Sequence, residues 1–252
     1  MRKLIIVGNW KMHTTPASSR ELARKLREGL DGFKAVDVGV CPPATSIPAV
    51  ADALGGSSIA WGAQNAHWEE EGAFTGEVSV KALKELDCTY AILGHSERRH
   101  IFGETDEMVA KRLAFVQKSG MIPILCVGET EAERQAGETE KVLERQLDTA
   151  VDELDSPPAV VAYEPVWAIG TGKRAQVSDV EAVHRFIRTR LNEKFNTSTD
   201  DVRIVYGGSV KPANVAELAG CEEIDGALVG GASLDADSFC TIVTRAFERR
   251  SN

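Results

Sequence analysis

The segment AVVAYEPVWAIGTGKRA, residues 159–175, contains a short β-branched run that stops at Glu164-Pro165. Pro165 cannot donate a ladder hydrogen bond, and it biases the residue before it toward an extended conformation. We therefore expect a strand that ends at Glu164, whose carboxylate faces the space beyond the strand. The alternative is a packed connection in which the glutamate is only solvated.

The residues after Glu164 combine apolar side chains with glycines. Trp167 and Ile169 favour burial, whereas the glycines permit unusual dihedrals and a close approach of the backbone to a ligand. We interpret this segment as a lid that is hinged at Pro165 and again near Ala175. The lid residues are Pro165, Val166, Trp167, Ala168, Ile169, Gly170, Thr171, Gly172 and Lys173.

On both sides of this segment the chain alternates β-branched runs with amphipathic stretches. Strands are expected over residues 4–7, 36–41, 59–64, 90–94, 121–127, 159–164, 202–206 and 226–229. Helical stretches include 18–30, 47–54, 106–119, 130–154, 183–195 and 239–247, with capping-box patterns at Thr130-x-x-Glu133 and Ser178-x-x-Glu181. About eight strand–helix units in ~250 residues predict an α/β fold, a (β/α)₈ barrel that forms a single domain over residues 1–252. The alternative, an open doubly wound sheet, lacks a glycine-rich dinucleotide fingerprint after the first strand.

Composition narrows the class of function. The formal net charge of -9 disfavours nucleic acid as a partner, because no basic stripe neutralises phosphates. No apolar run is long enough for a membrane span, and no signal peptide follows Met1, so we expect a cytoplasmic protein. The five scattered cysteines and five histidines show no metal-ligand spacing, so neither a metal nor a cofactor is implied.

Residues at the strand ends of such a barrel converge on one face, whatever their separation in the sequence. Asn9 and Lys11 follow the first strand, His95 and Glu97 the fourth, and Ser209 and the pair Gly230-Gly231 the last two. Glycines at those last two strand ends predict a phosphate site made of backbone N–H groups, although they also suit plain turns.

Lys11 and His95 are candidate site residues with simpler alternatives. A lysine is usually solvated, but Lys11 lies between Trp10 and Met12 and would offer a cation to an anionic substrate. His95 precedes a helix start, where the helix dipole disfavours imidazolium, so we expect a neutral ring that donates a hydrogen bond to a carbonyl oxygen. A lone histidine is otherwise more often structural. A base, a neutral acid, a cation, an anion site and a lid together suit proton abstraction next to the carbonyl of a small phosphorylated compound.

At these residues the sequence resembles the triosephosphate isomerase family nearly from end to end. The resemblance rests on GNWKM (8–12), AQN (63–65), GAFTGE (72–77), LGHSERR (93–99), GETDE (103–107), ILCVGE (124–129), YEPVWAIGTGK (163–173), YGGSV (206–210) and DGALVGGASL (225–234). His13 and Arg174 depart from residues that the family often has, at a local turn and at the second lid hinge. Neither departure touches the chemistry.

The resemblance implies an isomerase of glycolysis and gluconeogenesis that interconverts dihydroxyacetone phosphate and D-glyceraldehyde 3-phosphate through an enediolate. Glu164 would move the proton, His95 would polarise the carbonyl, and Asn9, Lys11 and Glu97 would complete the catalytic group. Asn9 and Lys11 would also bind substrate, with a phosphate grip of Gly170, Ser209, Gly230 and Gly231. Triosephosphate isomerases are themselves the usual illustration of these roles, so the roles follow from the resemblance and not from spacing.

Two other functions share parts of this pattern. A Schiff-base aldolase would need a desolvated lysine at a strand end, for which Lys11 is the candidate. A non-catalytic phosphosugar sensor would have no evident use for a carboxylate at the lid hinge.

The connection from Asn65 to Glu77 is long for a barrel loop, and its tip GAFTG (72–76) is apolar. Burial against a second copy would relieve that exposure, so we expect a homodimer closed about a two-fold axis. The resemblance implies that the tip enters a pocket beside Asn9, Lys11 and His95 of the other copy. The interface residues would be Phe74, Thr75, Glu77 and Arg98.

Overall fold

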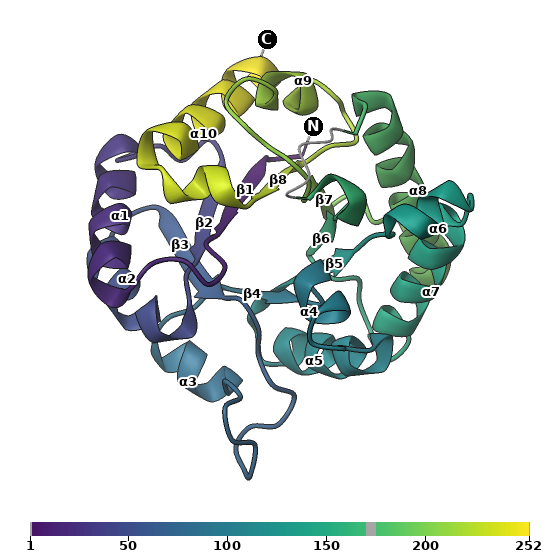
Figure 1. Cartoon of the computed structure of the whole chain (residues 1–252), viewed down its shortest axis with the longest axis horizontal. Coiled ribbons are helices and arrows are strands. Elements are labelled where there is room, and N and C mark those ends of the chain that lie inside the picture. Colours follow the sequence, from purple (N-terminus) through teal and green to yellow (C-terminus); the bar gives the residue numbers. More distant parts are fainter. Residues whose placement is uncertain (1, 170–174, 252) are drawn as a thin grey trace.

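The structure is a computed structural model that describes residues 2–169 and 175–251. Within these residues the strands form one closed parallel barrel, in which each strand pairs with the next and β8 pairs with β1 (Figure 1). The strands are β1 (Ile5–Asn9), β2 (Asp37–Cys41), β3 (Ile59–Ala63), β4 (Tyr90–Leu93), β5 (Ile122–Val127), β6 (Val160–Tyr163), β7 (Arg203–Tyr206) and β8 (Gly226–Val229). The expected (β/α)₈ barrel is confirmed. Gly170 to Arg174, which include part of the expected lid, lie outside the described residues.

Helices surround the barrel as an outer ring (Figure 1). They are α1 (Pro16–Gly29), α2 (Ile47–Leu54), α3 (Val80–Glu85), α4 (Ser96–His100), α5 (Asp106–Lys118), α6 (Glu131–Gln135), α7 (Thr139–Val151), α8 (Val177–Phe195), α9 (Val215–Ala219) and α10 (Ala236–Ser251), with 3₁₀ turns η1 (Ala44–Ser46), η2 (Val166–Ala168) and η3 (Gly231–Leu234). Alternate strand residues face opposite sides of the barrel wall. Ile5, Val7 and Ile124 therefore belong to the cluster inside the barrel, whereas Ile6 and Leu125 pack with the helices.

Two helix starts test the capping predictions. At α6 the Thr130 side chain accepts the N–H of Glu133 while the Glu133 carboxylate accepts the N–H of Thr130, so that capping box is confirmed. The box predicted at Ser178 is wrong, because α8 already begins at Val177 and no side-chain hydrogen bond caps it. A capping side chain must come from the residue before the first helical residue, and Ser178 lies inside the helix.

The single helix expected over residues 130–154 is also wrong. The structure divides it into α6 and α7, with Gly137 between them at a φ of 72°. A left-handed residue interrupts the helical hydrogen-bond ladder, and glycine takes this conformation without steric cost. The capping box therefore starts a helix of one turn, and the long charged helix begins only at Thr139.

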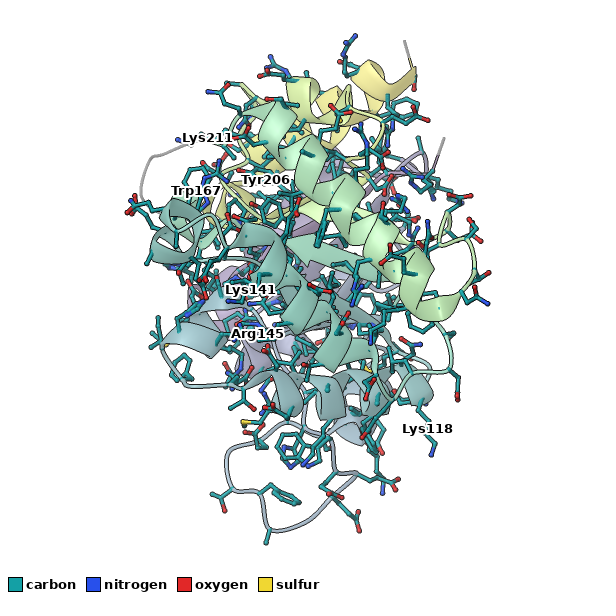
Figure 2. All side chains as sticks on the ribbon, turned by 90° about the vertical axis from the view of Figure 1, so that its right-hand side faces the viewer. Lys118, Lys141, Arg145, Trp167, Tyr206 and Lys211 are labelled. Carbon is teal, nitrogen blue, oxygen red and sulfur yellow. The ribbon has the colours of Figure 1, made fainter. Side chains whose placement is uncertain are left out.

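All strands run in the same direction, so their carboxyl ends share one face of the barrel. Figure 2 shows Trp167, Tyr206 and Lys211 toward one end of the molecule and Lys118 toward the other. The connection between β3 and α3 extends away from the barrel (Figure 1). None of the helices in the described part of the chain is long and apolar enough to cross a bilayer.

Candidate active site

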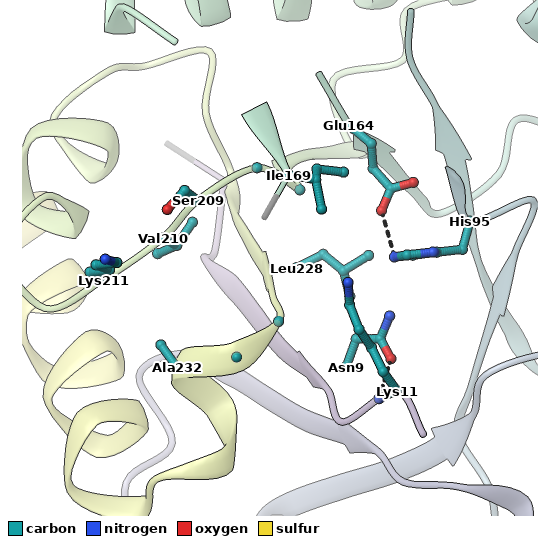
Figure 3. A pocket seen from close by; sticks show the side chains of 14 residues that line it. Asn9, Lys11, His95, Glu164, Ile169, Ser209, Val210, Lys211, Leu228 and Ala232 are labelled. Carbon is teal, nitrogen blue, oxygen red and sulfur yellow. Dashed lines mark hydrogen bonds and ion pairs between the residues drawn. The ribbon is translucent and has the colours of Figure 1, made fainter. Parts of the chain in front are cut away.

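A cavity of about 330 Å³ opens at the carboxyl ends of the strands (Figure 3). Its lining is Asn9, Lys11, His95, Glu164, Ile169, Gly207, Gly208, Ser209, Val210, Lys211, Leu228, Gly230, Gly231 and Ala232. The barrel therefore brings together the candidates that follow its first, fourth, sixth, seventh and eighth strands. Glu97 does not line this cavity but contacts Lys11 from α4. The remaining candidate, Gly170, lies outside the described residues.

Glu164 follows β6 directly, as Pro165 predicts. Its carboxylate is only 2% exposed and has two partners. One oxygen lies 2.9 Å from Nε2 of His95, and the other accepts the backbone N–H of Ser96 at 2.8 Å. A Cβ on Gly207 would lie 2.8 Å from Cγ of Glu164, so the absence of a side chain there leaves room for the carboxylate.

His95 is the residue before α4, and its ring has a different partner on each nitrogen. Nδ1 accepts the N–H of Glu97 at 3.2 Å, so this nitrogen carries no proton in that contact. Nε2 therefore carries the ring proton, and it points at the Glu164 carboxylate (Figure 3). The fold thus presents one N–H of a buried imidazole to the cavity.

The charges of Glu164 and His95 depend on each other. Burial raises the pKa of Glu164, but His95, the N–H of Ser96 and Lys11 lower it further, and the net pKa lies below the ordinary value. Burial lowers the pKa of His95, but the contact with Glu164 raises it above the ordinary value. The expectation of a neutral His95 therefore fails for this arrangement, because it considered the helix dipole and not a carboxylate in contact with the ring.

Lys11 has a backbone conformation that the sequence did not reveal. Its φ is 51°, in the left-handed region that a side chain makes unfavourable. Two neighbours hold this conformation: the side chain of Asn9 accepts the N–H of Lys11 at 3.0 Å, and Gln64 donates to its carbonyl at 2.7 Å. The result is an ammonium group in the cavity, 2.7 Å from Glu97.

The two glycine-rich turns line the opposite side of the cavity from His95 (Figure 3). Asn214 fixes the first turn, since its side chain donates to the carbonyl of Ser209 and accepts the N–H of Lys211. In the second turn, the N–H groups of Gly230 and Gly231 find no acceptor in the part of the chain that the structure describes. Free N–H groups at the start of a helical turn suit an anion.

The first part of the expected lid is anchored by a buried glutamate. Glu129 accepts hydrogen bonds from Tyr163 at 3.2 Å and from the indole N–H of Trp167 at 3.0 Å. The Arg134 guanidinium lies over the Trp167 ring, 4.5 Å from its centroid. Ile169, the last residue described before Gly170, lines the cavity. The lid call on Gly170 to Lys173 lies outside the described residues.

Sequence reasoning missed Gln64, Glu129, Tyr206 and Leu228. Burial raises the pKa of Tyr206, and hydrogen bonds from the backbone of Ala175 and Ser209 lower it, with a net rise. Tyr206 therefore connects the phosphate-side turn to the far end of the lid segment. Leu228 lines the cavity floor. The only signal for these residues was their place beside the motifs, because neither glutamine nor tyrosine signals chemistry by itself.

No group of three or more His, Cys, Asp or Glu side chains within residues 2–169 and 175–251 is arranged to hold a metal ion. The cavity instead offers an ionised carboxylate, a ring N–H, a lysine and free backbone N–H groups. This set can remove a proton from carbon, donate to a carbonyl oxygen and hold an anion.

Comparison with known proteins gives one consistent result. The family model described as triosephosphate isomerase matches residues 4–246. A triosephosphate isomerase of Moorella thermoacetica is 53% identical over 246 residues, which cover 96% of this chain and 98% of that protein. The triosephosphate isomerase of Carboxydothermus hydrogenoformans is 50% identical over 247 residues, with 96% and 98% covered. That of Rhodopirellula baltica is 47% identical over 249 residues, with 97% and 98% covered.

Proposed function

The chain belongs to the triosephosphate isomerase family and interconverts dihydroxyacetone phosphate and D-glyceraldehyde 3-phosphate, and we propose that Glu164 moves the proton in this reaction. One observation carries the proposal. The carboxylate of Glu164 is buried at the cavity and is held by partners that it can leave, a titratable ring and one backbone N–H. Its lowered pKa keeps it ionised at neutral pH, as a base must be.

The proposed sequence uses the two groups in turn. Glu164 leaves the His95 ring, takes a proton from the carbon next to the substrate carbonyl and returns it to the neighbouring carbon. The carbon–hydrogen electron pair moves into the enediolate, so no external oxidant or reductant is needed. Once the carboxylate has left, the influence that raises the pKa of His95 is gone, and the ring N–H on Nε2 donates to the substrate oxygen.

We assign electrostatic and orienting roles to Lys11, Asn9 and Glu97. The Lys11 ammonium offsets the charge of the substrate and of the enediolate. Asn9 fixes the strained backbone of Lys11 and lines the cavity, and the 2.7 Å ion pair with Glu97 orients the ammonium group. These contacts support the assignment, since a cation in a water-poor cavity acts most strongly when its position is fixed beforehand.

We assign the substrate phosphate to the glycine-rich side, with Ser209, Gly230 and Gly231 as donors and Gly170 as a fourth. The free N–H groups of the Gly230 turn support this assignment within the described residues. The lid, Pro165 to Lys173, would exclude water while the enediolate exists. Its support is the anchored start at Trp167 and the place of Ile169 in the cavity wall.

We propose that the working enzyme is a cytoplasmic homodimer. The protruding loop leaves Phe74 41% exposed, and Met12, Ile101 and Phe102 are 94%, 71% and 69% exposed. A second cavity of about 310 Å³ lies beside Asn9, Lys11 and His95 and is also lined by Met12 and Phe102. Large apolar side chains around a cavity favour a protein partner.

The expected meeting of Glu77 with the partner's Arg98 has competition inside the chain. Arg98 already contacts Glu104 at 2.5 Å, and Glu77 lies 3.8 Å from Arg112 of its own chain. The apolar tip with Phe74 and Thr75 therefore carries the interface proposal, and the ion pair adds little to it.

The direct test of the function is an assay of the purified protein on D-glyceraldehyde 3-phosphate, coupled to consumption of dihydroxyacetone phosphate. Turnover without cleavage of the carbon chain supports the isomerase, and its absence would leave only a phosphosugar sensor. Borohydride with substrate separates the aldolase, since a stable adduct on Lys11 requires a Schiff base.

Assembly has its own test. Thr75→Arg introduces a charge into the proposed pocket, so we expect monomers in sedimentation and loss of most turnover at matched concentration. A fully active monomer would contradict the coupling between assembly and catalysis. A surviving dimer would contradict the loop interface.

A further inference from the structure

Lys211 lines the active cavity although the proposed mechanism gives it no role. It lies two residues after Ser209 on the loop that follows β7. Figure 3 shows it on the side of the cavity opposite His95, beyond Ser209 and facing the turn of Ala232. This is the side to which the substrate phosphate is assigned.

The backbone of Lys211 is fixed, whereas its side chain is free to extend. Its N–H donates to Oδ1 of Asn214 at 2.7 Å, and the same side chain donates to the carbonyl of Ser209 at 2.9 Å. Val210 between them is buried and anchors the loop. Lys211 itself is exposed, so its ammonium group remains hydrated and can reach an approaching anion.

The two lysines of the cavity differ in their charge balance. The ammonium of Lys11 is paired with Glu97 at 2.7 Å. Lys211 has no ion-pair partner among residues 2–169 and 175–251. In a protein of net charge -9, an unpaired cation at the cavity mouth is a local attraction for a dianion that the rest of the surface repels.

We propose that Lys211 captures the phosphate dianion of the substrate at the mouth of the cavity and so helps to set specificity for phosphorylated substrates. The proposal rests on the isomerase function above and adds a residue that acts before the chemical step. The attraction of an exposed cation is of long range and is screened by salt, with a Debye length of about 10 Å at 0.1 M. Its effect therefore falls on association, that is on kcat/KM, and depends on ionic strength.

The test compares Lys211→Met and Lys211→Glu with the wild type. At low salt we expect kcat/KM to fall roughly threefold to tenfold for Lys211→Met and further for Lys211→Glu, with little change in kcat. Above about 0.5 M salt the differences shrink to less than about twofold, because the charge is screened. Lys211→Arg keeps the charge and restores kcat/KM.

Lys118→Met is the matched control, because Lys118 is an exposed lysine without a printed ion pair in the described chain and lies toward the opposite end of the molecule (Figure 2). Equal salt dependence of kcat/KM in the Lys211→Met and Lys118→Met variants would overturn the proposal.

Calorimetric binding of glycerol 3-phosphate, which cannot isomerise, separates this proposal from the isomerase function. Weaker binding by Lys211→Met at low salt supports capture by Lys211 even if the wild type shows no turnover. Unchanged binding with a fully active wild type would overturn the role of Lys211 and leave the isomerase function intact.

Discussion

The two ends of the barrel each contain a buried carboxylate, but their partners differ. Glu164 at the carboxyl end is 2% exposed, and its partners are the ring of His95 and one backbone N–H. Asp225, just before β8, is fully buried and contacts three arginines. Arg2 lies at 2.6 Å, Arg188 at 2.9 Å and Arg250 at 3.5 Å.

This difference separates a reactive carboxylate from a structural one. His95 can lose its proton, so Glu164 can move away without leaving a buried charge behind. An arginine stays charged in a protein, so Asp225 cannot leave its partners without stranding them. Asp225 also accepts the N–H of Ile204 at 2.9 Å and lines none of the cavities described. A base therefore needs partners that can change their charge and empty space to move into.

The largest effect should follow Glu164→Gln. Glutamine keeps the shape but cannot take a proton, so kcat should fall by roughly 10²- to 10⁴-fold or more. The free energy of unfolding should change by less than about 1 kcal/mol, because His95 can become neutral when its counter-charge is removed. Steady-state kinetics and urea unfolding measure the two effects.

Turnover within a few-fold of the wild type would contradict the role of Glu164 as the base. A large loss of stability would contradict the comparison instead, because Glu164 would then be as structural as Asp225.

Asp225→Asn should show the reverse pattern. Its removal leaves buried guanidinium groups without a counter-charge, so we expect a loss of about 3–5 kcal/mol in the free energy of unfolding. The kcat of the molecules that remain folded should stay close to that of the wild type, because the substitution lies at the far end of the barrel. Urea unfolding and active-site-normalised kinetics check both parts; a stable variant or a large loss of kcat would break the comparison.

The sequence predicts the reactive end far better than the structural end. Pro165 marks the strand end at Glu164, and parallel strands then bring His95 and Lys11 to the same face. Both facts depend on local chemistry and on one topological rule. Asp225 has no such signal, because its arginines come from residues 2, 188 and 250, and only the folded chain brings them together.

Geometry at the site was harder to predict than membership of the site. The left-handed φ of Lys11 depends on hydrogen bonds from Asn9 and Gln64, which lie on different strand ends. The raised pKa of His95 depends on where the Glu164 carboxylate lies, and a helix-dipole argument cannot include that. The false capping box at Ser178 shows the same limit, since the path of the preceding connection decides where α8 begins.

The comparison extends to a second buried histidine. His184 on α8 is buried, and its Nδ1 lies 3.1 Å from the carbonyl of Glu223. Burial is the main cause that lowers the pKa of His184 to about 4, whereas Glu164 raises the pKa of His95. Between pH 6.5 and 4 the unfolded chain therefore binds a proton at His184 that the folded chain does not, and stability is lost as the pH falls through this window.

We expect His184 to account for a loss of about 2 kcal/mol in the free energy of unfolding between pH 7.5 and pH 5. His184→Gln should lack this part of the pH dependence, whatever its stability at pH 7.5. Urea unfolding of both proteins at the two pH values, at one protein concentration, measures the difference. Parallel pH profiles would contradict the lowered pKa of His184.

The smallest expected effect tests redundancy at the structural end. Arg2 contacts Asp225 at 2.6 Å, donates to the carbonyl of Glu222 at 2.9 Å, and keeps its side chain 20% exposed. Arg2→Gln leaves Asp225 with Arg188, so the carboxylate stays paired and no buried charge is stranded. The free energy of unfolding should then fall by only about 1 kcal/mol, the worth of a partly solvated ion pair and a hydrogen bond, and kcat should not change. A loss as large as that of Asp225→Asn in urea unfolding would mean that Asp225 depends on each arginine separately. A carboxylate with several permanent cations tolerates the loss of one, whereas Glu164, with a single titratable partner, owes both its mobility and its charge to that partner.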